Sequence, residues 1–176
     1  MSVRVRSAVQ ADAAALHEVA AITFGLACPP GTEQHDIDAF IAEHLSESRF
    51  EQYLADADRE LLLAESGGEV VGYTMLVFGE PADPGIAAAV TARPTVELSK
   101  VYVLPGLHGS GASAALLSAT IDAARSRGVA GVWLGVNQQN VRANRFYEKK
   151  GFAQVGVKTF RVGAELHDDF VRELVF

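Results

Sequence analysis

Apolar residues recur along the chain with two periods, and each period predicts one type of secondary structure. Leu16, Val19, Ala20 and Thr23 follow the i, i+3, i+4, i+7 spacing of a helix, whereas residues 3–9 alternate like a strand. The whole pattern predicts, in chain order, a strand at 3–9, helices at 11–24, around 37–45 and around 50–54, a β-hairpin at 60–78, a strand at 95–104, a helix ending near 127, a strand at 129–136, a helix at 140–150, and strands at 152–162 and 169–176. No repeat or interdomain linker interrupts this order, so we expect one domain over residues 1–176.

Two segments break the pattern. Residues 79–94 are rich in Pro, Gly and Ala, and are either a mobile flap or a packed surface loop. In the strand at 95–104 the apolar alternation changes parity around Ser99 and Lys100. One extra residue there, a β-bulge, would restore a continuous inward face, and bulges often sit beside active sites; chance in a short window is the alternative.

A glycine-rich turn follows this strand and leads into the next helix. Gly106, Gly109 and Gly111 let the backbone approach an anion closely, and the amides at the helix start can point at it. Because the strand at 129–136 is almost entirely apolar, strand, loop, helix and strand read as a parallel βαβ unit. Such units bind ligands at the carboxyl end of the first strand, so the loop predicts a phosphate site.

Two phosphate-binding patterns fit this loop poorly. Read from Gly106 it has P-loop spacing, but Ala112 stands where the phosphate-binding lysine should be. Read from Gly109 it has the spacing of a dinucleotide fingerprint, but the following strand ends without an acidic residue for a ribose hydroxyl. Nucleotide hydrolysis and NAD binding are therefore poorly supported.

A third pattern covers a longer segment. "ELSKVYVLPGLHGSGASAALL" together with "NVRANRFYEKKGF" resembles the GNAT superfamily of acetyl-CoA-dependent N-acetyltransferases, and the resemblance extends over essentially the whole chain. His108 stands where the family's loop has Gln or Arg, and Ser113 replaces its last small residue, whereas the demanding Gly111 is present. The second motif is matched at Asn140, Ala143, Phe146, Tyr147, Lys149, Gly151 and Phe152.

The resemblance implies a mixed α/β fold. Its sheet would be central, mostly antiparallel, of six to seven strands and flanked by helices, with a splayed parallel βαβ unit binding acetyl-CoA. The pantetheine arm would pair with the backbone of the strand at 95–104, and the pyrophosphate would sit on amides of residues 109 to 114. The implied cofactor-binding residues are Val101, Tyr102, Val103, His108, Gly109, Ser110, Gly111, Ala112, Ser113, Ala114, Asn140, Ala143, Phe146 and Tyr147.

The same resemblance points to two catalytic residues. Tyr147, the motif tyrosine, would protonate the departing thiolate, unless it only packs in the core. Glu97 matches the family position often used as a base; working through water, it would take the proton of the attacking amine, with a plain structural carboxylate as the alternative. Further candidates for a base are His167, Asp168 and Asp169, which together with Glu33, His35, Asp36 and Asp38 would either line an acidic acceptor pocket or form a solvated surface.

Composition narrows the partners. The net charge of −7 disfavours nucleic acid and favours a cationic partner, and the one cysteine, Cys28, precludes an internal disulfide. No run approaches a membrane span and no metal-ligand spacing occurs, so we expect a soluble, cytoplasmic enzyme without metal, and dimers are common in the family. The chain is most similar to bacterial PaiA-like acetyltransferases, so the expected acceptor is a small amine such as a polyamine; a protein or peptide N-terminus, or CoA sensing without catalysis, are the alternatives.

Overall fold

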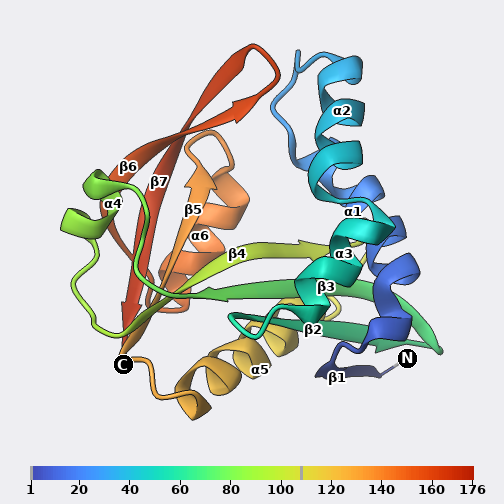
Figure 1. Cartoon of the computed structure of the whole chain (residues 1–176), viewed down its shortest axis with the longest axis horizontal. Coiled ribbons are helices and arrows are strands. Elements are labelled where there is room, and N and C mark those ends of the chain that lie inside the picture. The colour runs from blue at the N-terminus through green and yellow to red at the C-terminus, as the bar shows by residue number, and fades with distance from the viewer. Residues whose placement is uncertain (1, 108) are drawn as a thin grey trace.

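The computed structural model describes residues 2–107 and 109–176. Its centre is one seven-stranded sheet with strand order β1-β2-β3-β4-β5-β7-β6, in which only the β4–β5 pair is parallel (Figure 1). The strands are β1 (Val3–Ser7), β2 (Arg59–Ser66), β3 (Glu69–Phe78), β4 (Thr95–Val103), β5 (Gly131–Asn137), β6 (Ala153–Val162) and β7 (Glu165–Val175). The predicted mixed, mostly antiparallel sheet flanked by helices is confirmed.

Helices cover both faces of the sheet (Figure 1). Three of them, α1 (Ala13–Ala27), α2 (Gln34–His44) and α3 (Glu47–Ala55), lie on one face, where α1 and α3 pack against β2 and β3. On the other face lies α5 (Ala112–Ser126), against which β2, β3 and β4 pack, together with α6 (Val141–Lys149). The two largest hydrophobic cores lie on opposite faces: Tyr73 and Met75 of β3 belong to the first and Leu76 to the second, as alternation along a strand requires.

The segment 79–94 is packed. It contains a short helix, α4 (Pro84–Ala89), whose Ile86 is buried against Trp133 and Val171. The Glu173 carboxylate fixes the chain beyond α4, because it accepts hydrogen bonds from the amides of Thr91 and Ala92 at 2.9 to 3.1 Å. Of the two alternatives for residues 79–94, the structure therefore has the packed surface loop and not the flap.

The β-bulge predicted in β4 is confirmed. Met75 of β3 pairs with Lys100, and the next residue, Leu76, pairs with Leu98, so Ser99 is the extra residue. The bulge brings Glu97 and Lys100 to the same face of the sheet although their numbers differ in parity. Among the described residues, no helix is long and apolar enough to cross a membrane, and no group of His, Cys, Asp and Glu side chains could hold a metal ion.

Candidate active site

A cavity opens where the two parallel strands separate. β4 and β5 pair only through Thr95–Glu97 and Gly131–Trp133, and beyond these residues the strands diverge. The cavity between and around the diverging ends has a volume of about 770 Å³ and is lined by residues from both faces of the sheet. The predicted splayed βαβ unit is therefore present, and it produces one continuous space that joins the α1 side of the sheet to the α6 side.

The backbone of β4 presents free hydrogen-bonding groups to this gap. The Leu104 amide donates to the Val71 carbonyl oxygen at 2.8 Å, so every second residue of β4 faces β3. The alternation directs the main-chain groups of Val101 and Val103 the other way, toward β5, which has already turned away. An extended ligand could add to this exposed edge as an extra strand.

The glycine-rich turn has the conformation that its glycines predict. Gly109 and Gly111 have φ values of +87° and +86°, in the left-handed region that residues with a Cβ disfavour. At the start of α5 the amides of Ser113 and Ala114 donate to no described residue, so they are available to an anion. Two other amides of the predicted pyrophosphate site already donate hydrogen bonds within the protein. The Ser110 amide donates to the Leu107 carbonyl oxygen, and the Ala112 amide donates to the Ser110 hydroxyl.

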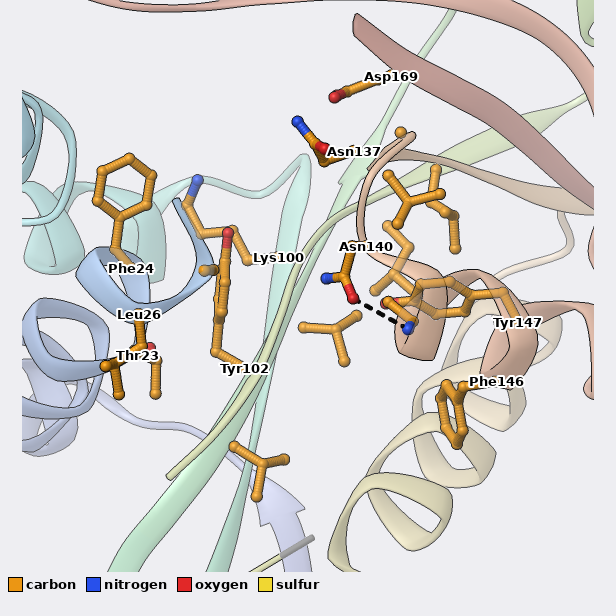
Figure 2. A pocket seen from close by; sticks show the side chains of 18 of the residues that line it. Thr23, Phe24, Leu26, Lys100, Tyr102, Asn137, Asn140, Phe146, Tyr147 and Asp169 are labelled. Carbon is orange, nitrogen blue, oxygen red and sulfur yellow. Dashed lines mark hydrogen bonds between the residues drawn. The ribbon is translucent and has the colours of Figure 1, made fainter. Parts of the chain in front are cut away.

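The start of α6 is held by a polar network that runs from the exposed Asn140 to the buried Arg172. The Asn140 side chain caps the helix by accepting from the Ala143 amide at 3.1 Å (Figure 2). Asn144 donates to the carbonyl oxygens of Asn137 and Asn140, and its own oxygen accepts from Nε of Arg172 at 2.9 Å. These bonds tie α6 to β5 and β7 and fix the direction of the next helical turn.

That turn carries Tyr147, which lines the cavity on the α6 side. Its ring packs edge-on against Phe146 and Phe152, and the residue is only 8% exposed. Burial raises the pKa of the Tyr147 phenol far above its ordinary value, so the hydroxyl keeps its proton throughout the physiological range. A neutral phenol facing a cavity is a hydrogen-bond donor.

The opposite, α1 side of the cavity is where the charged residues gather. Figure 2 shows Lys100 and Tyr102 extending from β4 toward α1, where Phe24 lies, while Tyr147 stands on the other side of the strand. Glu97 also lines the cavity, and burial raises its pKa although the cations Lys158, Lys100 and Arg59 act in the opposite direction. A carboxylate with a raised pKa is a stronger base than an exposed one.

The remaining candidate carboxylates and histidines divide between the cavity and the surface. His167 and Asp169 line the cavity, and burial raises the pKa of Asp169 although Lys158 lies 3.5 Å from its carboxylate. The other predicted members of an acidic pocket are not among the lining residues: Glu33, His35, Asp36, Asp38 and Asp168. The acidic acceptor pocket expected from the sequence is thus reduced to one of its carboxylates, Asp169, beside Glu97.

The residues expected to bind the cofactor mostly meet in one place. Those that line the cavity are Val101, Tyr102, Val103, Gly109, Gly111, Ser113, Ala114, Asn140, Ala143, Phe146 and Tyr147. Ser110 and Ala112 belong to the same turn but do not line the cavity, and His108 lies outside the described residues. The side chain of Tyr102 lies next to Tyr73 on the α1 side, so its contribution to the α6 side is limited to its main chain.

Several cavity residues were missed from the sequence. Lys100, Lys158 and Arg142 are the cationic ones, and Phe24, Phe40 and Phe160 are the aromatic ones. The parity slip at the bulge was the available signal for Lys100, because it moves this residue to the face of Glu97. The others come from segments far apart in the sequence, and no local pattern marks them.

Known proteins share both the sequence and the fold. The model of the acetyltransferase (GNAT) family matches residues 27–152. An uncharacterized N-acetyltransferase of Mycobacterium tuberculosis is 48% identical over 166 residues, which are 93% of this chain and 99% of that protein. Among solved structures, the PaiA N-acetyltransferase from Thermoplasma acidophilum in complex with coenzyme A has a TM-score of 0.79 at 20% identity and covers 100% of both chains.

A second solved structure shows how widely this fold is used. The ribosomal-protein-S18-alanine N-acetyltransferase from Escherichia coli has a TM-score of 0.71 at 19% identity, over 99% of this chain and 94% of that chain. Both likenesses concern the fold; the name of the Escherichia coli protein gives its acceptor as an alanine of ribosomal protein S18, and the name of the Thermoplasma protein gives none. The match to the family model and the 48% identical relative decide the family: this chain belongs to the GNAT acetyltransferases, acyl-CoA N-acyltransferases that use acetyl-CoA.

Proposed function

We propose that the protein transfers the acetyl group of acetyl-CoA directly to a primary amine of a small molecule. The observation that carries the proposal is the continuous cavity between the diverging ends of β4 and β5, with Tyr147 on the α6 side and Glu97 on the α1 side. A thioester and an amine approaching from opposite sides of the sheet would meet in this gap. The GNAT likeness to a PaiA N-acetyltransferase is consistent with an amine acceptor.

The residues on the α6 side fit coenzyme A. The amides of Ser113 and Ala114, free of described partners at the positive end of α5, suit a pyrophosphate, each favourable interaction contributing about 1 kcal/mol. The exposed backbone edge at Val101 and Val103 suits the amide groups of a pantetheine arm. When bound, acetyl-CoA supplies an acetyl group activated as a thioester, together with a thiolate leaving group.

Two side chains handle the protons. Because burial raises the pKa of Tyr147, full proton transfer from its phenol is costly, and the favoured role is donation of a hydrogen bond to developing charge on sulfur. Glu97 accepts the proton of the attacking amine, directly or through a water molecule. Its raised pKa narrows the gap to the amine and makes this transfer less unfavourable.

Direct transfer is favoured over an acyl-enzyme. Cys28 lines the cavity and is the one thiol in the chain. Burial and the charge of Glu165 raise its pKa, which disfavours the nucleophilic thiolate. A cysteine nucleophile would need the opposite environment.

The shape of the α1 side favours a small acceptor. The turn between β6 and β7 packs against α2 so closely that a Cβ at Gly163 would overlap the carboxyl group of Asp36. Phe40 of α2 lies edge-on to Phe160 of β6, with ring centroids 5.6 Å apart. These two contacts narrow the α1 side of the cavity, which favours a small molecule or an extended N-terminus over a bulky protein surface.

The test is an acceptor screen with purified protein. Thiol release from acetyl-CoA is followed with primary amines, polyamines, amino acids and N-terminal peptides, and products are identified by mass spectrometry. We expect acetylation of at least one small primary amine, with the Cys28→Ser variant as active as the unchanged protein. Binding of acetyl-CoA without turnover on any amine would instead indicate a CoA sensor, and turnover restricted to peptides would indicate a protein N-acetyltransferase.

A further inference from the structure

One lysine on the α1 side of the cavity lacks a partner for its charge. Lys100 extends from the bulge of β4 into the cavity (Figure 2), and it forms no hydrogen bond or ion pair with the described residues. Burial lowers its pKa to about 8, so much of it is still protonated at neutral pH. Lys100 is half-buried, and an anionic partner would offset the cost of the partial desolvation of its charge.

The other charged side chains on the α1 side either form an ion pair or have a role in the proposed reaction. Lys158 lies 3.5 Å from the carboxylate of Asp169. The Lys158 side chain fits there because residue 135 is glycine, and a Cβ added at this position would overlap it. The charge of Glu97 raises the pKa of Lys100, yet no ion pair within 4 Å joins the two side chains. Lys100 is therefore available to an anionic group that the protein itself does not supply.

Three aromatic rings line the same side of the cavity as Lys100. Phe24 and Phe40 stack with ring centroids 4.3 Å apart, and Phe160 meets Phe40 edge-on. These rings line the same cavity as Lys100 and would contact the body of a bound molecule. The α1 side thus combines a carboxylate that can receive a proton from an amine, a cation without a partner, and an aromatic wall.

We propose that the acceptor is an α-amino acid with an apolar side chain, whose carboxylate pairs with Lys100 while its amine faces Glu97 and its side chain packs on the phenylalanines. This inference rests on the proposed function, transfer to a small primary amine. A polyamine fits less well, because it brings additional positive charges next to Lys100 and offers it no anion. The bulge in β4 is what sets Lys100 and Glu97 on one face of the sheet.

The test compares acceptors that differ only in the carboxylate. L-phenylalanine is paired with phenethylamine and L-leucine with 3-methylbutylamine, and spermidine represents polyamines. We expect kcat/KM to be at least 30-fold higher for each amino acid than for its decarboxylated partner, the effect of one charged hydrogen bond in a buried site. In the Lys100→Met variant the preference falls toward one, through a higher KM for the amino acids, and Lys100→Arg restores much of it. Lys149→Met, an exposed lysine on α6, is the matched control and keeps the wild-type ratio.

Binding of the product gives a readout that does not need turnover. N-acetyl-L-phenylalanine should bind to the wild-type protein at least ten-fold more tightly than N-acetylphenethylamine does. The Lys100→Met variant should bind both compounds weakly and with the same Kd. Thermal unfolding verifies that the variant is folded. Equal use of both members of a pair, or preference for spermidine, overturns the inference and leaves the proposed function standing. Failure to acetylate any amine overturns both.

Discussion

Asn144 is predicted to link the stability of the protein to its turnover. The residue is 9% exposed, and its side chain donates to the carbonyl oxygens of Asn137 at 3.1 Å and Asn140 at 2.9 Å and accepts from Arg172 at 2.9 Å. Arg172 itself is buried and also donates to the Phe152 carbonyl oxygen. Replacement of Asn144 by alanine removes three hydrogen bonds and leaves one edge of a buried guanidinium without a partner.

The magnitude follows from these contacts. A hydrogen bond to a charged group contributes about 1.5–3 kcal/mol and a neutral one about 0.5–1.5 kcal/mol, while alanine is the better helix former by about 0.6 kcal/mol. We therefore expect Asn144→Ala to lower the free energy of unfolding by about 3 kcal/mol. For a chain of this length that corresponds to a decrease in Tm of about 10 °C.

Two assays check this prediction. Thermal unfolding should show the decrease in Tm, and kcat should fall about ten-fold because Tyr147, one turn further along α6, is no longer held in a fixed direction. Arg145→Ala, on the exposed face of the same helix, is the control and should change neither quantity. In the double variant Asn144→Ala/Arg172→Met the loss of stability should be smaller than the sum of the two single losses, since both polar partners are gone. A Tm equal to that of the control would refute the assigned role of the network.

Three further predictions concern the proposed chemistry. Tyr147→Phe should reduce kcat about 10²-fold and leave the Kd for CoA unchanged; stopped-assay kinetics and calorimetry separate the two, and an unchanged kcat would exclude the phenol. Gly111→Val forces a β-branched residue to a φ of +86° at a strain of about 1–3 kcal/mol, so calorimetry should find CoA binding lost in a folded protein, whereas wild-type affinity would disprove the loop assignment. Because Glu97 acts as a base only when deprotonated, kcat/KM should fall as the pH decreases through the pKa of Glu97, which is raised above the ordinary value of glutamate. Glu97→Gln should lower kcat/KM and abolish this decrease at acidic pH. A decrease that persists in the variant would show that another group titrates.

The sequence predicts the α6 side of the cavity well because its signals are local. Gly109 and Gly111 need a left-handed backbone, and the structure gives them one. The parity slip near Ser99 predicts the bulge, since a buried face has to stay continuous. Each of these inferences needs only a few neighbouring residues, so tertiary contacts do not alter it.

The segment 79–94 shows where local reasoning was incomplete. Asp83 caps α4 by accepting from two amides, and Pro84 occupies the first turn, which are ordinary helix-start signals. The composition of the segment concealed them, because six helical residues are too few for a periodic pattern. Its packing depends on Glu173, 81 residues beyond Ala92, and such a distant partner has no local signature.

The same contrast explains why the cofactor can be assigned and the acceptor has to be tested. The groups suited to coenzyme A come from one stretch of chain, the end of β4 through the start of α5, together with α6. Those around Lys100 come from α1, α2, β4 and the β6–β7 hairpin, and only folding brings them together. A substitution at Phe24, Lys100 or Phe160 can therefore change the acceptor and leave the acetyl donor untouched. Acceptor preference should accordingly differ among GNAT proteins that share the glycine turn, and it should follow the charge at position 100 more closely than overall sequence identity.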